Sequence, residues 1–245
     1  MATGTTSSTP TPTTDRRWSG RWTAGRLIST VLTLAVVWNL VGNLWLPGWL
    51  YIPANLAIAS LLVLVARRAG LSWSELGLAR DDVGRGLLYG LAAFVLIGAV
   101  LALGLVVPPV EDALHDDSVR DASGFDRWFV PLVRIPLGTA LFEEILFRSV
   151  LLGGLLLSMR TWKAVAVSSL IFGLWHIVPA WETTEGGAWA ITGTVIGTVA
   201  ITSLGGVLFG TLRVGSRSIL APILAHTATN SLAYAAAIVA IEVLD

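Results

Sequence analysis

The chain has 245 residues, of which 54% are hydrophobic and only 13% are charged, and its mean hydropathy is +0.75. Soluble globular domains carry about 25% charged residues, so this composition predicts an integral membrane protein. Lys and Arg balance Asp and Glu at 16 each, which argues against binding to nucleic acid or another polyanion. The chain contains no cysteine, which excludes a thiol nucleophile, a disulfide framework and cysteine-ligated metals.

The N-terminal residues 1–25 are predicted to form a disordered tail, and residues 26–245 the membrane domain. Residues 2–14 are rich in Thr, Ser and Pro and show no apolar periodicity, a composition that cannot bury enough apolar surface to fold. Four arginines then lead into an apolar run over 27–46. Because this run is long enough to cross a membrane and lacks a small-x-small cleavage site, we expect a retained signal anchor.

Six further apolar runs follow, at about 49–66, 86–107, 128–158, 163–181, 189–212 and 218–241. Between them, residues 69–85 are amphipathic and are expected to lie at the membrane interface, and residues 108–127 form an acidic loop. The predicted fold class is therefore all-α, a polytopic membrane helical bundle of about seven transmembrane helices.

The basic residues predict the orientation of this bundle. With the N-terminus in the cytoplasm, twelve of the 16 Lys and Arg lie on the cytoplasmic side, in the tail and in residues 67–85, 160–163 and 213–217. The other four are Arg120 and Arg127 outside, and Arg134 and Arg148 within the 128–158 run. This distribution satisfies the positive-inside rule, so we expect a multi-pass protein of the cell membrane with a cytoplasmic N-terminus.

Three of the predicted spans carry polar side chains deep in apolar sequence. These side chains are Glu143, Glu144 and Arg148 in the first of the three spans, His176 in the second, and His226 and Asn230 in the third. Ionisable groups at such depth cost several kcal/mol unless they are paired or functional. On a helix, Glu144 and Arg148 face each other at i, i+4, whereas Glu143 points about 100° away. One carboxylate is therefore held by a guanidinium, and the second is left to act.

Two carboxylates, two imidazoles, a carboxamide and a guanidinium suit the activation of water and the stabilisation of an oxyanion. Structural roles also fit each group taken alone, because a membrane histidine often hydrogen-bonds a neighbouring helix and Glu144–Arg148 makes a plain ion pair. Glu143 and Glu144, however, cannot both use one arginine. Purely structural polar groups on three separate spans would also be an expensive arrangement, so we favour a functional site.

Three motifs in order carry a family resemblance: Glu143-Glu144-x-x-x-Arg148, Phe172-x-x-x-His176 and His226-x-x-x-Asn230. With the residues around them, over about 130–235, they resemble the CPBP family of intramembrane proteases, which includes type II CAAX prenyl endopeptidases and abortive-infection proteins. The resemblance implies an intramembrane endopeptidase that hydrolyses peptide bonds of membrane-associated peptides or protein tails. Its expected partners are membrane lipids and such a substrate.

The resemblance also implies a role for each motif residue. Glu143 and His176 would activate the attacking water. His226 and Asn230 would stabilise the oxyanion, while Glu144 and Arg148 would organise the site.

The resemblance leaves the cofactor open between zinc and none. An older interpretation of the family is a metalloprotease with Glu143, His176 and His226 as zinc ligands. Two His and one Glu are a recognised catalytic zinc set, but the same residues also support a metal-free mechanism in which Glu and His activate the water.

Other function classes fit the same residues. A non-catalytic scaffold or immunity-type protein of the same family would keep the polar core, and a proton-coupled transporter would use buried Glu, His and Arg as a relay. A serine protease is disfavoured because no G-x-S-x-G elbow is present, and an aspartyl protease because the predicted spans contain no Asp.

Overall fold

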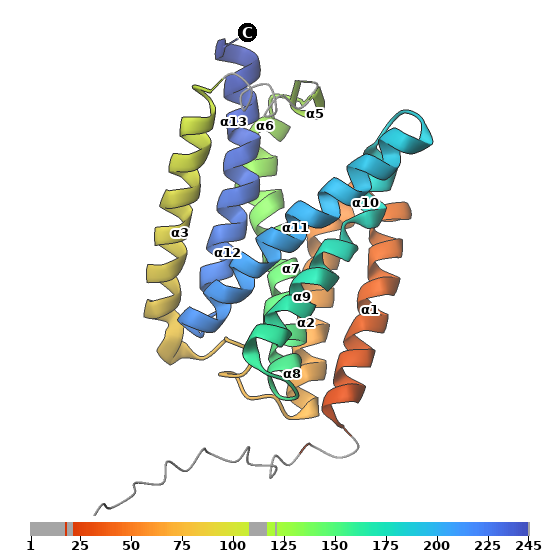
Figure 1. Cartoon of the computed structure of the whole chain (residues 1–245), viewed down its shortest axis with the longest axis vertical. Coiled ribbons are helices and arrows are strands. Elements are labelled where there is room, and N and C mark those ends of the chain that lie inside the picture. Colours follow the sequence, from red (N-terminus) through yellow and green to blue (C-terminus); the bar gives the residue numbers. More distant parts are fainter. Residues whose placement is uncertain (1–17, 19–21, 108–116, 121, 245) are drawn as a thin grey trace, which may run out of the picture.

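The computed structural model describes residues 18, 22–107, 117–120 and 122–244, which form an all-helical bundle without a strand in that part of the chain (Figure 1). The predicted fold class is therefore confirmed. Most of the predicted tail 1–25 and much of the acidic loop 108–127 lie outside the described residues. The division into a tail and a membrane domain thus stays a prediction.

Six helical stretches are long and apolar enough to cross a membrane. They contain α1 (Ala24–Leu44), η1 (Gly48–Leu50) with α2 (Tyr51–Ala69), η2 (Arg80–Asp82) with α3 (Val83–Gly104), α9 (Thr161–Trp175) with α10 (Ile177–Thr183), α11 (Ala188–Ser216), and a last run made of α12 (Leu220–Thr227), η5 (Ala228–Leu232), α13 (Ala233–Val239) and η6 (Ala240–Leu244). The short helix α5 (Asp117–Arg120) precedes the helical run over 126–156. The chain is accordingly a multi-pass membrane protein.

The predicted 128–158 span forms one more helical run, whose winding changes along its length. It consists of α6 (Asp126–Phe129), η3 (Val130–Ala140), α7 (Leu141–Glu144), η4 (Ile145–Leu151) and α8 (Leu152–Leu156). Here η3 and η4 are π-helical, and η3 contains Pro131 and Pro136, which have no N–H to donate to an α-helical turn. Wide π-helical turns are frequent at functional sites, and in this run they flank both glutamates.

The amphipathic segment predicted at 69–85 starts as a packed loop. Leu71 and Leu76 in this loop are fully buried. The carbonyl of Leu76 accepts a hydrogen bond from the Ser149 hydroxyl at 2.7 Å, and that of Gly77 accepts one from the N–H of Ile219 at 2.9 Å. The apolar residues that suggested an interfacial segment therefore anchor the loop to the end of the bundle.

Arg213 of α11 holds the same loop. Its side chain is buried, and Nη2 donates to the carbonyl oxygens of Ser74 at 3.4 Å and Glu75 at 2.8 Å. The guanidinium lies directly against Gly77, whose φ of +72° is in the left-handed region. A glycine is required here both by the backbone conformation and by the space that the arginine fills.

We expect Gly77→Ala to destabilise the protein, because the added Cβ would clash with the Arg213 guanidinium and would strain the backbone. The cost should be at least about 1 kcal/mol, measured as faster thermal inactivation of the purified protein in detergent. Gly84→Ala is the matched control, since a Cβ on this glycine of α3 would meet no atom within 4 Å. Equal inactivation rates for the two variants would contradict this role of Gly77.

Candidate active site

Three motif residues of α7 and η4 and one of α12 form a single buried polar cluster. Glu143, Glu144, Arg148 and His226 are 6%, 0%, 1% and 3% exposed. Oε1 of Glu144 accepts hydrogen bonds from Nη1 of Arg148 at 3.1 Å and from Nδ1 of His226 at 2.8 Å. The ion pair expected from the i, i+4 spacing is present, and the same carboxylate also fixes the imidazole.

Aromatic rings enclose the cation of this cluster. The Cζ of Arg148 lies 4.0 Å from the ring centroid of Phe172 and 5.2 Å from that of Phe209. Phe209 also stacks on the His226 ring, with centroids 4.8 Å apart. Ring faces attract a desolvated cation, so these contacts partly offset the removal of the guanidinium from water. Phe172 thereby joins the second motif to the first.

Glu143 has a different environment from Glu144. Its Oε1 accepts a hydrogen bond from the indole N–H of Trp175 at 3.3 Å, whereas its Oε2 has no hydrogen-bond partner and lies 3.8 Å from Nε2 of His226. Because Nδ1 of His226 donates to Glu144, a neutral ring presents an unprotonated Nε2 towards Glu143. Glu144 also keeps one oxygen, Oε2, without a hydrogen-bond partner, but of the two glutamates only Glu143 lines a cavity.

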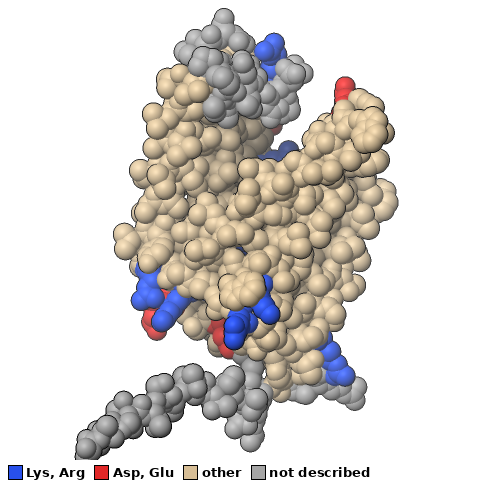
Figure 2. Space-filling model, viewed as in Figure 1, with Lys and Arg blue, Asp and Glu red and all other residues tan. Residues whose placement is uncertain are grey.

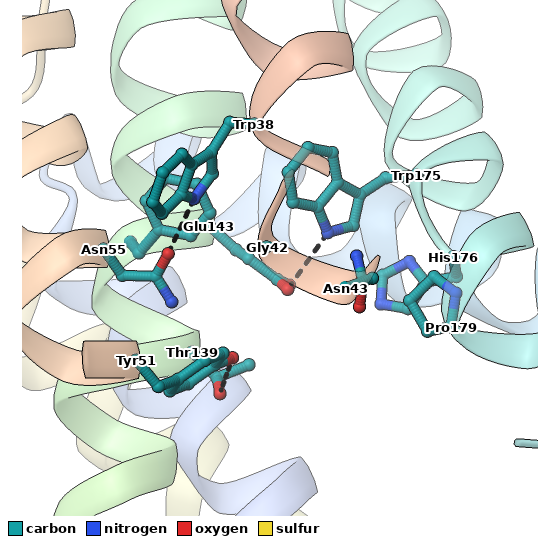
Figure 3. Close-up of a pocket in the computed structure, with 11 residues that line it drawn as sticks. Trp38, Gly42, Asn43, Tyr51, Asn55, Thr139, Glu143, Trp175, His176 and Pro179 are labelled. Atoms are coloured by element: carbon teal, nitrogen blue, oxygen red, sulfur yellow. Dashed lines mark hydrogen bonds between the residues drawn. The ribbon is translucent and has the colours of Figure 1, made fainter. Parts of the chain in front are cut away.

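Glu143 lies on the wall of a cavity of about 240 Å³ (Figure 3). The wall is built from α1, α2, η3, α7 and the junction of α9 and α10: Trp38, Gly42, Asn43, Tyr51, Asn55, Thr139, Phe142, Glu143, Trp175, His176 and Pro179. Indole rings, carboxamides and hydroxyls surround a single carboxylate, so the cavity combines apolar walls with a few hydrogen-bonding groups. This is the usual make-up of a small-molecule or substrate pocket.

His176 reaches this cavity because the predicted 163–181 helix breaks at that residue. Pro179 has no N–H to donate to the carbonyl of Trp175, four residues earlier, and α9 ends at Trp175. The freed carbonyl accepts a hydrogen bond from Nδ2 of Asn39 at 3.0 Å. Nδ1 of His176 lies 2.8 Å from the carbonyl oxygen of Phe172, which only accepts, so Nδ1 donates and Nε2 is left for the cavity.

Asn230 does not join the other motif residues. It lies one turn beyond His226, in the π-helical η5, and it is neither buried with the cluster nor part of the cavity wall. The structure therefore gathers four motif residues into one cluster, places His176 on the cavity that Glu143 shares, and leaves Asn230 apart.

The predicted zinc ligands do not converge. Within the described part of the chain, no group of three or more His, Asp or Glu side chains is arranged to hold a metal ion. His226 faces the two glutamates, whereas His176 lies on the cavity wall. Zinc at Glu143, His176 and His226 stays a prediction, and the chemistry proposed for the site does not depend on it.

The sequence interpretation missed the contribution of the first two helices. Asn55 of α2 is 3% exposed, accepts a hydrogen bond from the Trp38 indole at 2.7 Å and donates one to the carbonyl of Gly138 at 2.9 Å. Asn39 of α1 supports Trp175, which in turn binds Glu143. The criterion that singled out Glu and His, a polar side chain deep in an apolar span, would have found these asparagines as well.

The fold and these contacts define a helical membrane protein with a buried cluster of Glu, Arg and His beside a polar cavity. Residues 125–232 match the family described as type II CAAX prenyl endopeptidase Rce1-like, and all three motifs lie within the match. The match confirms the family resemblance predicted from the motifs. Comparisons with curated proteins and with solved structures gave no match.

Arg148→Ala should strongly destabilise the protein, because it leaves the Glu144 carboxylate buried without its cation. Breaking a buried pair in this way costs about 3–5 kcal/mol. The matched control is Arg127→Ala, which removes a cation paired with Glu242 at the surface, where such a pair contributes about 1 kcal/mol or less. Thermal unfolding of both purified variants in detergent measures the difference. Similar unfolding temperatures would show that the buried pair is not needed for stability.

Proposed function

We propose that the protein is an intramembrane endopeptidase that hydrolyses peptide bonds of membrane-associated peptides or protein tails. The main support is Glu143, a buried carboxylate with one oxygen that lacks a hydrogen-bond partner, on the wall of a cavity that His176 also lines. A buried carboxylate inside a membrane costs free energy unless it is paired or functional. Arg148 already pairs with Glu144, so it does not neutralise Glu143. The match to a family of prenyl endopeptidases supports the reaction class.

In the proposed reaction, a water molecule between Glu143 and His176 attacks the carbonyl carbon of the scissile peptide bond. Glu143 takes one proton from the water as the new C–O bond forms, and negative charge moves onto the carbonyl oxygen. When the tetrahedral intermediate collapses, the C–N bond breaks and Glu143 passes its proton to the departing nitrogen. The products are a carboxylic acid and an amine, so the carboxylate of Glu143 is regenerated.

The other motif residues support these steps in the proposal. His176 orients the water through Nε2, because Nδ1 is used by the carbonyl of Phe172. Glu144 holds the tautomer and ring position of His226, whose Nε2 points towards Glu143. A protonated His226 would stabilise the oxyanion electrostatically. The oxyanion contact expected of Asn230 stays a prediction, because Asn230 lies outside the cavity wall.

The proposal includes a location and partners. We place the protein in the cell membrane with its N-terminus in the cytoplasm, because the Lys and Arg residues gather at one end of the bundle. Its partners are membrane lipids and a polypeptide substrate. The neutral overall charge gives no support to a nucleic-acid partner.

Glu143→Gln should reduce cleavage by about 10²–10⁴-fold, the usual contribution of a general base. The amide keeps an oxygen that can accept from Trp175 but cannot take a proton from water. Cleavage of a labelled membrane-peptide library by purified protein in detergent, followed by mass spectrometry, measures the effect. Zinc content determined on the same samples tests the metal prediction separately.

The matched control is Glu182→Gln, because Glu182 is an exposed residue of α10 away from the cavity wall. This variant should cleave the library as the wild type does. Equal cleavage by the Glu143 and Glu182 variants would reject Glu143 as the base. Full function of the Glu143 variant in cells would instead support the non-catalytic scaffold.

A further inference from the structure

The cavity beside Glu143 lies near one end of the bundle. On α1, its wall includes Asn43, next to the last residue of the helix, and at 1.5 Å per residue Asn43 lies about 28 Å from the start of α1. On α2, the wall includes Tyr51 and Asn55, which lie in the first two turns. The cavity is therefore close to the α1–α2 connection, at the opposite end of α1 from its first residue (Figure 1).

The junction of α9 and α10 gives the same placement. Trp175, His176 and Pro179 follow the first residue of α9 by at least fourteen positions, which is about 21 Å along the helix. The chain then continues through α10 into the turn that starts α11, and this turn lies on the same side of the bundle as the α1–α2 connection (Figure 1). Four helices thus agree on the end of the bundle at which the cavity sits.

The basic side chains gather at the opposite end. They lie in the last turn of α2, at the start of α3, at the start of α9 and at the end of α11: Arg67, Arg68, Arg80, Arg85, Arg160, Lys163, Arg213 and Arg217. On the face shown in Figure 2, most of the Lys and Arg side chains cluster toward the lower end of the view, where α1 begins in Figure 1. Basic residues that flank transmembrane helices favour the cytoplasmic side.

We propose that the cavity beside Glu143 opens on the non-cytoplasmic side of the membrane, and that its substrates are polypeptide segments on that side. Exported peptides and the outer juxtamembrane segments of membrane proteins are of this class. A protein tail in the cytoplasm, prenylated or not, would have to cross the bilayer to reach Glu143. The identity of the substrate rests on the proposed function, whereas the side on which the cavity opens does not.

The cavity wall adds a chemical constraint on the same substrate. It contains one carboxylate, Glu143, and no Lys or Arg, so it offers no cation to an acidic side chain at the scissile bond. Asn43 presents a carboxamide, which hydrogen-bonds to backbone N–H and C=O groups alike. Apolar and uncharged side chains around the cleaved bond fit this wall best.

The absence of native cysteine allows the side of the opening to be tested by labelling single cysteines in the full chain. Asn43→Cys reports on the cavity, and Thr139→Cys is a second cavity reporter if the first variant does not accumulate. Gly187→Cys, where an added Cβ meets no atom within 4 Å, marks the α10–α11 turn. Ser158→Cys, exposed and two residues before Arg160, marks the basic end.

Each variant is expressed in cells, and intact spheroplasts are treated with a membrane-impermeant maleimide. We expect the cavity reporter to react as fully as Gly187→Cys, and Ser158→Cys to react only after the membrane is permeabilised. The reverse pattern would overturn the proposal. So would a cavity reporter that reacts only after permeabilisation while Gly187→Cys reacts before it.

Cleavage tests the substrate class independently of the labelling. Two single-span reporters carry the same uncharged apolar segment, one on the outer side of the membrane and one on the inner side. Each reporter is co-expressed with wild type and with Glu143→Gln. We expect wild type alone to cleave the outer segment, and cleavage confined to the inner segment would overturn the proposal. If labelling places the cavity outside and wild type cleaves neither reporter, the substrate assignment fails together with the proposed function, while the side of the opening stands.

Discussion

The structure depends on one carboxylate oxygen, Oε1 of Glu144, which accepts from both Arg148 and His226. All three side chains are almost completely buried, so each would carry a large desolvation cost without the others. The shared oxygen also joins the central helical run to α12, although the two residues that it connects are 82 positions apart in the chain. The position of the His226 ring, and with it the environment of Glu143, follows from this interaction.

Adjacent glutamates can take different roles here because their surroundings differ. Glu144 meets a guanidinium enclosed by Phe172 and Phe209, whereas Glu143 meets an indole N–H and a cavity. The enclosing rings also exclude water from the ion pair, and electrostatic interactions are stronger where water is excluded. The Glu144–Arg148 pair therefore holds this part of the helix in place, and the carboxylate of Glu143 projects from the same turn towards the cavity.

The sequence was sufficient to predict the helical spans and the pairing of Glu144 with Arg148, because both follow from local rules of apolar length and helical spacing. It did not predict the helix break at His176. The break leaves the carbonyl of Trp175 without its helical donor, and Asn39, 136 positions earlier in the chain, supplies the hydrogen bond. Nor did it predict the packed loop that contains Leu76. The backbone carbonyls of this loop accept hydrogen bonds from the side chains of Ser149 and Arg213. Contacts between distant segments determine these features, and a single sequence shows no pattern for them.

Two parts of the chain line the cavity, and they contribute different kinds of residue. Residues 125–232, the segment that matches the protease family, contain both glutamates and both histidines of the site. The remaining wall comes from α1 and α2, outside that segment, through Trp38, Gly42, Asn43, Tyr51 and Asn55. Asn39 of α1 supports Glu143 indirectly, because it holds the backbone of Trp175, whose indole donates to Glu143. In the proposed enzyme, the matched segment therefore supplies the chemistry, while the two N-terminal helices shape the space that selects the substrate.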